Sequence, residues 1–320
     1  MTAANIHADT RGMTREEWLE ERRKGIGGSD ASAILGLNPY CSPLKVYMDK
    51  IGKGEEQETN EAMRQGTDLE QYVADRFVEE TGLKVKKCNR MLRHQEHDWM
   101  LANVDRLVVG MNAGLECKTT SPYSKFKFDE GEINPHYYWQ SMHYMAVTGA
   151  EKWYVAILVL GKSFHVFELK RDENAIETLI AAEKDFWEEY VLKKIPPLPI
   201  GNDSDDEAIS ELYPEGIEEF SDDVLELDGK EDMLNLRDFK VKQRDELDNE
   251  IKAIDQELKL MLGDFQHGLT TSWRVNWTNT NTSRIDTKLL KQKYPQIAEE
   301  VTKTTNGRRF SLAKMTTKED

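Results

Sequence analysis

Residues 101–120 read LANVDRLVVGMNAGLECKTT, two alternating apolar stretches joined by a short glycine-containing connection. The alternation predicts neighbouring strands over about 98–109 and 114–120. Further strand patterns occupy 83–92, 153–160 and 163–170, and helical patterns occupy about 60–81, 135–149 and 172–193. The order of helices, three strands, helix, two strands and helix predicts an α/β (α+β) fold, one mixed sheet flanked by helices.

Three polar side chains interrupt these central strands. Glu116 and Lys118 are two residues apart, so they are expected to face the same side, with Leu115 and Cys117 on the other. Asp105 lies in an apolar strand, where a carboxylate needs a cation or hydrogen bonds to offset its desolvation. Two carboxylates beside an ammonium form an oxygen-rich site of the kind that suits Mg²⁺ or Mn²⁺. A plain salt bridge between Asp105 and Lys118 is the alternative.

Helices on either side of these strands supply further candidates. Glu70 shares a helix face with Gly66, Val73 and Phe77, so it is expected to point inward rather than to be a surface acid. Gln140 and Tyr144 lie four apart on one face, suited to supporting the site or to holding a DNA backbone. His136 and His143 beside them are interpreted as surface or structural residues, not as metal ligands.

The net charge of −16 does not exclude a nucleic-acid ligand. Residues 201–232 contain fourteen acids against one lysine, which is −13, so the rest of the chain carries about −3. The chain lacks an apolar run of membrane-spanning length, and its start lacks the apolar stretch of a secretory signal. We therefore expect a protein of the cytoplasm with no membrane partner.

The composition also predicts the domain organisation. We expect a catalytic domain over 1–199, an acidic linker over 200–230, and a C-terminal module over 231–320 containing a long helix and a small strand–helix–strand unit. Apolar residues of the long helix follow 4-3-4-3 spacing, too few for an independent coiled coil, so they are expected to pack on a neighbouring element. They are Leu247, Ile251, Ile254, Leu258 and Met261.

The motifs together resemble a known nuclease core. An inward Glu on a helix, then VD, ExK and QxxxY, resembles the core of lambda-type exonucleases, YqaJ-type viral recombinases and RecB-like nucleases of the PD-(D/E)XK superfamily. Residues 18–40, WLEERRKGIGGSDASAILGLNPY, are similar to the opening motif of the YqaJ and lambda-exonuclease branch. The resemblance covers about 14–195.

This resemblance implies a metal-dependent deoxyribonuclease with a PD-(D/E)XK, restriction-endonuclease-like core. Mg²⁺ or Mn²⁺ would be held by Glu70, Asp105, Glu116 and the Cys117 backbone carbonyl, with Lys118 orienting the attacking water. Digestion would run 5′ to 3′ on duplex DNA ends and leave a single strand for an annealing protein in phage-type recombination. The resemblance also implies that the cytoplasm is that of a bacterium or a phage-infected host. Family members can form a trimeric ring.

Arg22 and Ser29 match the family residues that bind the 5′-phosphate. A guanidinium and a hydroxyl at a helix N-terminus suit a phosphate, and Gly25, Gly27 and Gly28 are expected to allow close backbone approach. Ser29 as a simple helix N-cap is the alternative. An iron–sulfur cluster is not expected, because the related cluster nucleases use four cysteines and this chain has three.

Three other functions remain open on the sequence. The same site would serve a structure-selective or single-strand endonuclease. The carboxylates could instead be structural in a noncatalytic module that binds DNA or a protein partner. The acidic segment could mimic DNA, in the enzyme's own groove or toward a basic partner.

Overall fold

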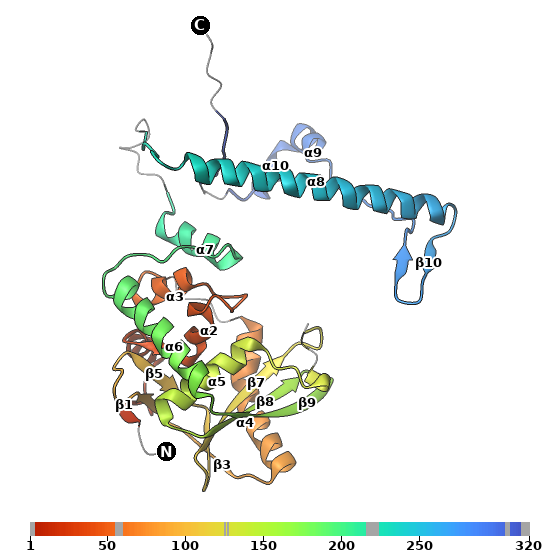
Figure 1. Ribbon diagram of the computed structural model, residues 1–320. Helices are drawn as coiled ribbons and strands as arrows, with labels where there is room; N and C mark the ends of the chain where they lie inside the picture. The colour runs from red at the N-terminus through yellow and green to blue at the C-terminus, as the bar shows by residue number, and fades with distance from the viewer. Residues whose placement is uncertain are drawn as a thin grey trace. The chain divides into compact units, whose positions relative to one another are not determined.

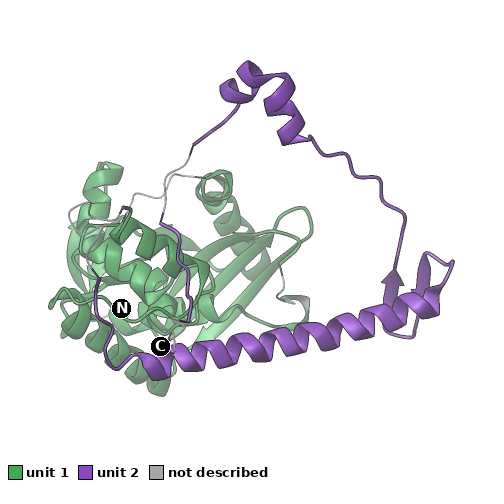
Figure 2. Ribbon diagram, turned by 90° about the horizontal axis from the view of Figure 1, so that it is seen from above, with its two compact units in different colours: residues 1–214 green, residues 215–320 purple. Residues whose placement is uncertain are grey.

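The computed structural model describes residues 4–54, 60–124, 126, 128–215, 224–304 and 308–314, with the backbone alone at residue 129. The chain forms two compact units, Met1–Pro214 and Glu215–Asp320, which Figure 2 shows in different colours.

The first unit alternates helices and strands. In chain order these are β1 (Asn5–Asp9), α1 (Arg15–Arg23), β2 (Ile26–Gly27), α2 (Gly28–Ile34), α3 (Pro43–Lys50), α4 (Glu61–Thr81), β3 (Val85–Lys87), β4 (Arg90–Arg93), β5 (Met100–Asn103), β6 (Arg106–Val108), β7 (Ala113–Thr120), a 3₁₀ turn (Phe128–Glu130), α5 (Pro135–Thr148), β8 (Lys152–Val159), β9 (Ser163–Lys170), α6 (Glu173–Asp185), a π-helical turn (Phe186–Val191) and α7 (Asp203–Leu212).

Capping residues set the helix ends where the sequence predicts them. Asn60 caps α4 by accepting a hydrogen bond from the Met63 amide, and Gly82 ends that helix in the left-handed region at φ 70°. Asn134 and Gly149 delimit α5 in the same way. The α/β character of the fold is confirmed.

The strands form two sheets in this unit: the larger is the predicted mixed sheet flanked by helices, and the smaller is a second sheet that the sequence did not predict. A five-stranded sheet has the order β3-β6-β7-β8-β9, in which β7 and β8 are parallel, and a four-stranded sheet has the order β1-β4-β5-β2. The predicted strands over 83–92 and 98–109 each break in the middle, and the chain passes from one sheet to the other at the break.

Two helices cover the two faces of the five-stranded sheet (Figure 1). On one face, Val73 and Phe77 of α4 pack against Leu115 of β7. On the other, Met142 and Met145 of α5 belong to the core that contains Trp153 of β8. Glu116 and Lys118 alternate with Leu115, so they face α5 as the spacing predicts.

Helix α7 belongs to the first unit, which therefore extends past the predicted boundary at residue 199 to Pro214. Ala208 is buried against the α3 core, and the Ser42 amide donates to Ser204 Oγ at 2.7 Å. Lys45 of α3 forms an ion pair with Glu211. Part of the predicted acidic linker is thus a packed helix, while residues 216–223 lie outside the described residues.

The second unit is mostly helical. It contains α8 (Glu231–Leu262), a hairpin of β10 (His267–Leu269) and β11 (Arg274–Asn276), α9 (Thr287–Lys293) and α10 (Pro295–Glu300). The long helix is confirmed. The predicted strand–helix–strand order is wrong, because its second strand was expected over RRFSL, residues 308–312, and these residues do not form a strand. Among the described residues of the second unit the α8 stripe is not covered, since Leu247, Ile251 and Ile254 are all more than half exposed, and its packing on a neighbouring element stays a prediction. Among the described residues, no helix has the length and apolar character that a membrane span requires.

Candidate active site

Glu116 is the buried carboxylate at the centre of the site. Its Oε1 accepts a hydrogen bond from Gln140 Nε2 at 2.8 Å and lies 2.6 Å from Lys118 Nζ. Its Oε2 is also buried and has no hydrogen-bond partner among the described residues. A buried carboxylate oxygen without a partner is costly. The Glu116 carboxylate is therefore incomplete without a further cationic or hydrogen-bonding group.

Asp105 supplies the second carboxylate, from the point where the chain crosses between β5 and β6. Its Oδ2 accepts a hydrogen bond from the Cys117 amide at 2.8 Å, which fixes it beside Glu116. Burial raises the pKa of Asp105 well above its ordinary value, and repulsion from Glu116 raises it further, while Lys118 lowers it. Two neighbouring carboxylates resist full ionisation unless a cation lies near both. The donor set thus fits a hard divalent ion bound through oxygen.

Lys118 provides a permanent positive charge at the site. Burial lowers the pKa of its ammonium, but Glu116 and Asp105 outweigh this, and the pKa is raised overall. The ammonium also lies 5.4 Å from the centre of the Tyr137 ring. A protonated lysine can donate hydrogen bonds and stabilise negative charge, but it cannot accept a proton.

Glu70 lies near enough to Asp105 for its charge to help raise the pKa of that carboxyl, but its carboxylate is paired with an arginine. It extends from α4, which packs on the opposite face of the sheet, and forms an ion pair with the buried Arg106 of β6. Within the part of the chain that the structure describes, no group of three or more His, Cys, Asp and Glu side chains could hold a metal ion. Sequence reasoning missed Arg106, although an arginine directly after Asp105 in an apolar strand signals a buried partner acid.

Gln140 and Tyr144 support the carboxylates from α5. Gln140 Nε2 donates to both Glu116 Oε1 and the Tyr144 hydroxyl, the latter at 2.9 Å. Both side chains are buried. Because they are buried, they hold Glu116 in place and do not present a surface to a DNA backbone. Of the two roles that the sequence suggests for them, their position in the structure fits support of the site.

Gly28 allows α2 to pack directly against Tyr144, and this gives a test of the packing. A Cβ at position 28 would lie 2.6 Å from Tyr144 Cε1, while a Cβ at Gly27 would meet nothing closer than 3.6 Å. We expect Gly28→Ala to destabilise the protein by about 1–3 kcal/mol, because the hydrogen-bonded Tyr144 ring cannot easily move aside. Gly27→Ala, the matched control, should cost less than about 1 kcal/mol. Thermal unfolding of the two variants measures the difference, and equal melting temperatures would contradict the contact.

The glycine result also corrects the sequence interpretation. Gly25 and Gly28 are needed for packing, since a Cβ at Gly25 would lie 2.4 Å from the Trp99 carbonyl oxygen. Of the three glycines expected to approach a phosphate, only Gly27 could carry a Cβ without a clash, since the nearest atom would be Asp30 Oδ2 at 3.6 Å.

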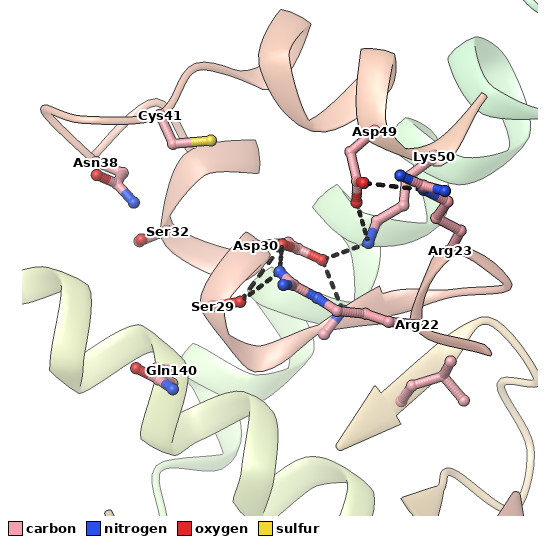
Figure 3. Close-up of polar contacts among 12 residues, drawn as sticks. Arg22, Arg23, Ser29, Asp30, Ser32, Asn38, Cys41, Asp49, Lys50 and Gln140 are labelled. Carbon is pink, nitrogen blue, oxygen red and sulfur yellow. Dashed lines mark hydrogen bonds and ion pairs between the residues drawn. The ribbon is translucent and has the colours of Figure 1, made fainter. Parts of the chain in front are cut away.

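Arg22 and Ser29 lie together, as Figure 3 shows. Arg22 Nη2 donates to Ser29 Oγ and to Asp30 Oδ1, both at 2.8 Å. Lys50 Nζ lies 2.8 Å from Asp30 Oδ2, which also accepts from the Gly27 amide. Burial alone would raise the pKa of Asp30, but Lys50 and Arg22 outweigh it and hold the pKa well below its ordinary value. Gly27, not Ser29, is the N-cap of α2.

Sequence reasoning missed Asp30 and Lys50, which anchor this cluster. A cavity of about 210 Å³ lies beside them. Arginines and lysines contribute much of its lining, which includes Arg15, Arg22, Arg23 and Lys45. A basic cavity next to a fixed guanidinium suits a phosphate group.

The two histidines of α5 have separate surroundings. His143 is buried between Glu183, at 2.8 Å, and the Leu101 carbonyl oxygen, also at 2.8 Å, so it is structural. His136 is partly buried and contacts Ser32 and Asn38 of the α2 region.

Comparison with known proteins places the chain in a family. Residues 17–151 match the model of the YqaJ-like viral recombinase domain. The chain is also 37% identical over 314 residues to the uncharacterized protein YqaJ of Bacillus subtilis (strain 168), covering 97% of both proteins. The chain belongs to the YqaJ family. The matched residues include both carboxylates and Gln140 with Tyr144. They also include the Arg22 cluster, which consists of Arg22, Ser29, Asp30 and Lys50.

More distant matches to this YqaJ family member were also found. Uncharacterized protein R354 of Acanthamoeba polyphaga mimivirus is 23% identical over 196 residues, 58% of this chain and 32% of that protein. Among solved structures, an alkaline exonuclease (LHK-Exo) from Laribacter hongkongensis has a TM-score of 0.47 and 21% identity, over 56% of this chain and 94% of that one. A phage related exonuclease from Haemophilus somnus 129PT has a TM-score of 0.43 and 12% identity, over 53% and 96% respectively.

Proposed function

We propose that this YqaJ family member is a metal-dependent exonuclease that digests duplex DNA from 5′ ends and leaves a single strand for an annealing protein. The observation that carries the proposal is the pair formed by Asp105 and the buried Glu116, in which Glu116 Oε2 has no partner among the described residues. Lys118 lies beside this pair, and the cavity lined by Arg22 offers a site for a phosphate. A trimeric ring remains a prediction of the family resemblance.

Asp105 and Glu116 would hold the ion, with the Cys117 backbone carbonyl as a predicted third oxygen. Bound Mg²⁺ or Mn²⁺ polarises a phosphodiester and lowers the pKa of an attacking water. Gln140 keeps Oε1 of Glu116 in place, so that Oε2 stays available. Lys118 stays protonated and stabilises the negative charge that develops on the phosphate. Glu70 stays with Arg106 in this arrangement.

Arg22 and Ser29 would bind the terminal 5′-phosphate. Arg22 uses Nη2 for Ser29 and Asp30, and a guanidinium carries five donors in all, so others remain for a phosphate. Asp30 and Lys50 hold the guanidinium in position. A group that recognises a chain end favours the exonuclease over the endonuclease with the same carboxylates.

Digestion of linear and circular DNA tests the proposal. Linear duplex with and without a 5′-phosphate, and closed circular duplex, are each incubated with Mg²⁺, Mn²⁺ or EDTA. We expect metal-dependent loss of linear DNA that is faster with the phosphate, while circles persist. Cutting of circles would show an endonuclease instead. Intact DNA under all conditions would support the noncatalytic binding module.

The raised pKa of Asp105 predicts a gain of stability when its charge is removed. The pKa of Asp105 is raised in the folded protein, so its ionisation opposes folding and the stability falls as the pH rises through that pKa. At neutral pH, Asp105→Asn should therefore raise the melting temperature in EDTA by a few degrees, since each pKa unit is worth about 1.4 kcal/mol. Differential scanning calorimetry with and without Mg²⁺ measures it.

The same experiment contains its control. Mg²⁺ should raise the melting temperature of the wild type and much less that of Asp105→Asn, because the variant lacks one of the two charges that bind the ion. A lower melting temperature for the variant in EDTA, or an equal response to Mg²⁺, would contradict the assignment.

A further inference from the structure

A second cavity lies beyond Lys118, at the end of β7. Its volume is about 380 Å³, and it lies between the β7–α5 connection, the start of α5 and the loop before α3. Aromatic residues supply much of its lining: Tyr40, Tyr123, Phe126, Phe128 and Tyr137. Polar side chains, among them Ser124 and Asn134, also line it. Flat apolar faces beside hydrogen-bonding groups suit a flat ligand with a polar edge.

Two of these rings are unusually exposed. Tyr40 is 83% exposed and Tyr123 is 93% exposed, so neither contributes to the core. Single exposed aromatic residues are common and need no explanation. Here, however, two of them come from loops far apart in the sequence and line the same cavity. This arrangement points to a ligand that stacks on them.

The aromatic cavity is connected to the carboxylates through Tyr137. The Tyr137 ring lines the cavity and lies 5.4 Å from Lys118 Nζ. Along α5, Gln140 reaches Glu116, Tyr137 lies toward the N-terminus, and Tyr144 lies toward the C-terminus, where it contacts Gly28. The aromatic cavity and the Arg22 cluster therefore lie in opposite directions along α5 from the candidate metal ligands.

We propose that the aromatic cavity binds an unpaired nucleobase of the strand being cut, on the 3′ side of the scissile phosphate. The inference rests on the proposed function: with the terminal phosphate at Arg22 and the scissile bond at Glu116, the strand continues toward Tyr137. Every nucleobase presents a π face for stacking and a polar edge for hydrogen bonds, so the site accepts any sequence. Stacking on Tyr40 and Tyr123 keeps that base separated from the complementary strand.

Tyrosine substitutions combined with a modified substrate test the site. Tyr40→Ala and Tyr123→Ala should each raise KM for 5′-phosphorylated linear duplex about tenfold with little change in kcat, the size expected for one lost stack. Tyr40→Phe and Tyr123→Phe keep the ring and should restore the wild-type KM. Tyr213→Ala, an exposed tyrosine outside the cavity, is the matched control and should behave as wild type.

An abasic nucleotide immediately 3′ of the first cleaved bond, located from the product length, removes the ligand instead of the site. The wild type should then lose as much as the alanine variants, and these variants should lose nothing more. Additive losses, or alanine variants with wild-type KM on normal DNA, would overturn the inference while leaving the nuclease intact.

A binding measurement separates failure of the inference from failure of the proposed function. Single-stranded DNA carrying 2-aminopurine is titrated in EDTA, where cleavage is absent. Stacking should quench the fluorescence with wild-type protein and with the phenylalanine variants, but not with Tyr123→Ala. Quenching without any cleavage in Mg²⁺ would support the base site and refute the nuclease. Equal signals from wild type and Tyr123→Ala would refute the base site.

Discussion

Glu116→Gln is expected to lower the rate of metal-dependent DNA cleavage at least about a hundredfold, the size of losing one charge-stabilising group from an active site. The change keeps the shape of the side chain, and its amide oxygen can still accept from Gln140 Nε2. It removes the negative charge that attracts a divalent ion and that pairs with Lys118. Initial rates of linear duplex loss, at several Mg²⁺ concentrations, measure the effect.

The effect of Glu70→Gln on activity and stability is to be compared with that of Glu116→Gln. The family resemblance makes Glu70 a metal ligand, whereas in the structure it forms an ion pair with Arg106. We expect a smaller loss of activity than from Glu116→Gln, accompanied by a loss of stability because Arg106 is buried and would lack its partner charge. An equal loss of activity at unchanged stability would show that Glu70 leaves Arg106 to bind the ion. Wild-type cleavage by Glu116→Gln would remove Glu116 from the site.

Helix ends and the alternation of side chains along a strand depend on residues close together in the sequence, so they could be predicted from it. Helix caps such as Asn60 and Asn134 act within one turn, and strand alternation places Glu116 and Lys118 on one face whatever the rest of the chain does. The division into two sheets was not predictable in the same way. Alternation continues through the breaks in 83–92 and 98–109, so hydrophobic periodicity does not reveal which strand pairs with which.

Ion pairs between distant residues were likewise not visible in the sequence. Asp30 and Lys50 are ordinary charged residues of two short helices, and only the packing of α2 against α3 brings them together in a buried pair. The same holds for Glu70, which faces the sheet as the helix periodicity predicts but meets the buried Arg106 there. Periodicity tells which side of an element is covered, but it does not identify the partner there.

The Arg22 cluster is expected to distinguish 5′-phosphorylated from unphosphorylated DNA ends. Arg22→Ala should reduce the preference for 5′-phosphorylated over unphosphorylated ends about tenfold to a hundredfold, the equivalent of one hydrogen-bonded charge pair. Ser29 Oγ would also lose the donor that fixes it, and Asp30 would keep Lys50 as its partner, so the fold should persist. The ratio of initial rates on the two kinds of end is the measured quantity.

Arg23→Ala is the matched control, because it removes the same charge from the same cavity. Arg23 bonds to Asp49 at 3.3 Å and makes no hydrogen bond to Ser29 in the structure. If the cavity attracted DNA only through its net charge, both variants would weaken cleavage of both kinds of end alike, and more so at low salt. If Arg22 instead holds the terminal phosphate against Ser29, only Arg22→Ala changes the ratio, and it does so at every salt concentration. An unchanged ratio in Arg22→Ala would place recognition of the chain end elsewhere in the protein.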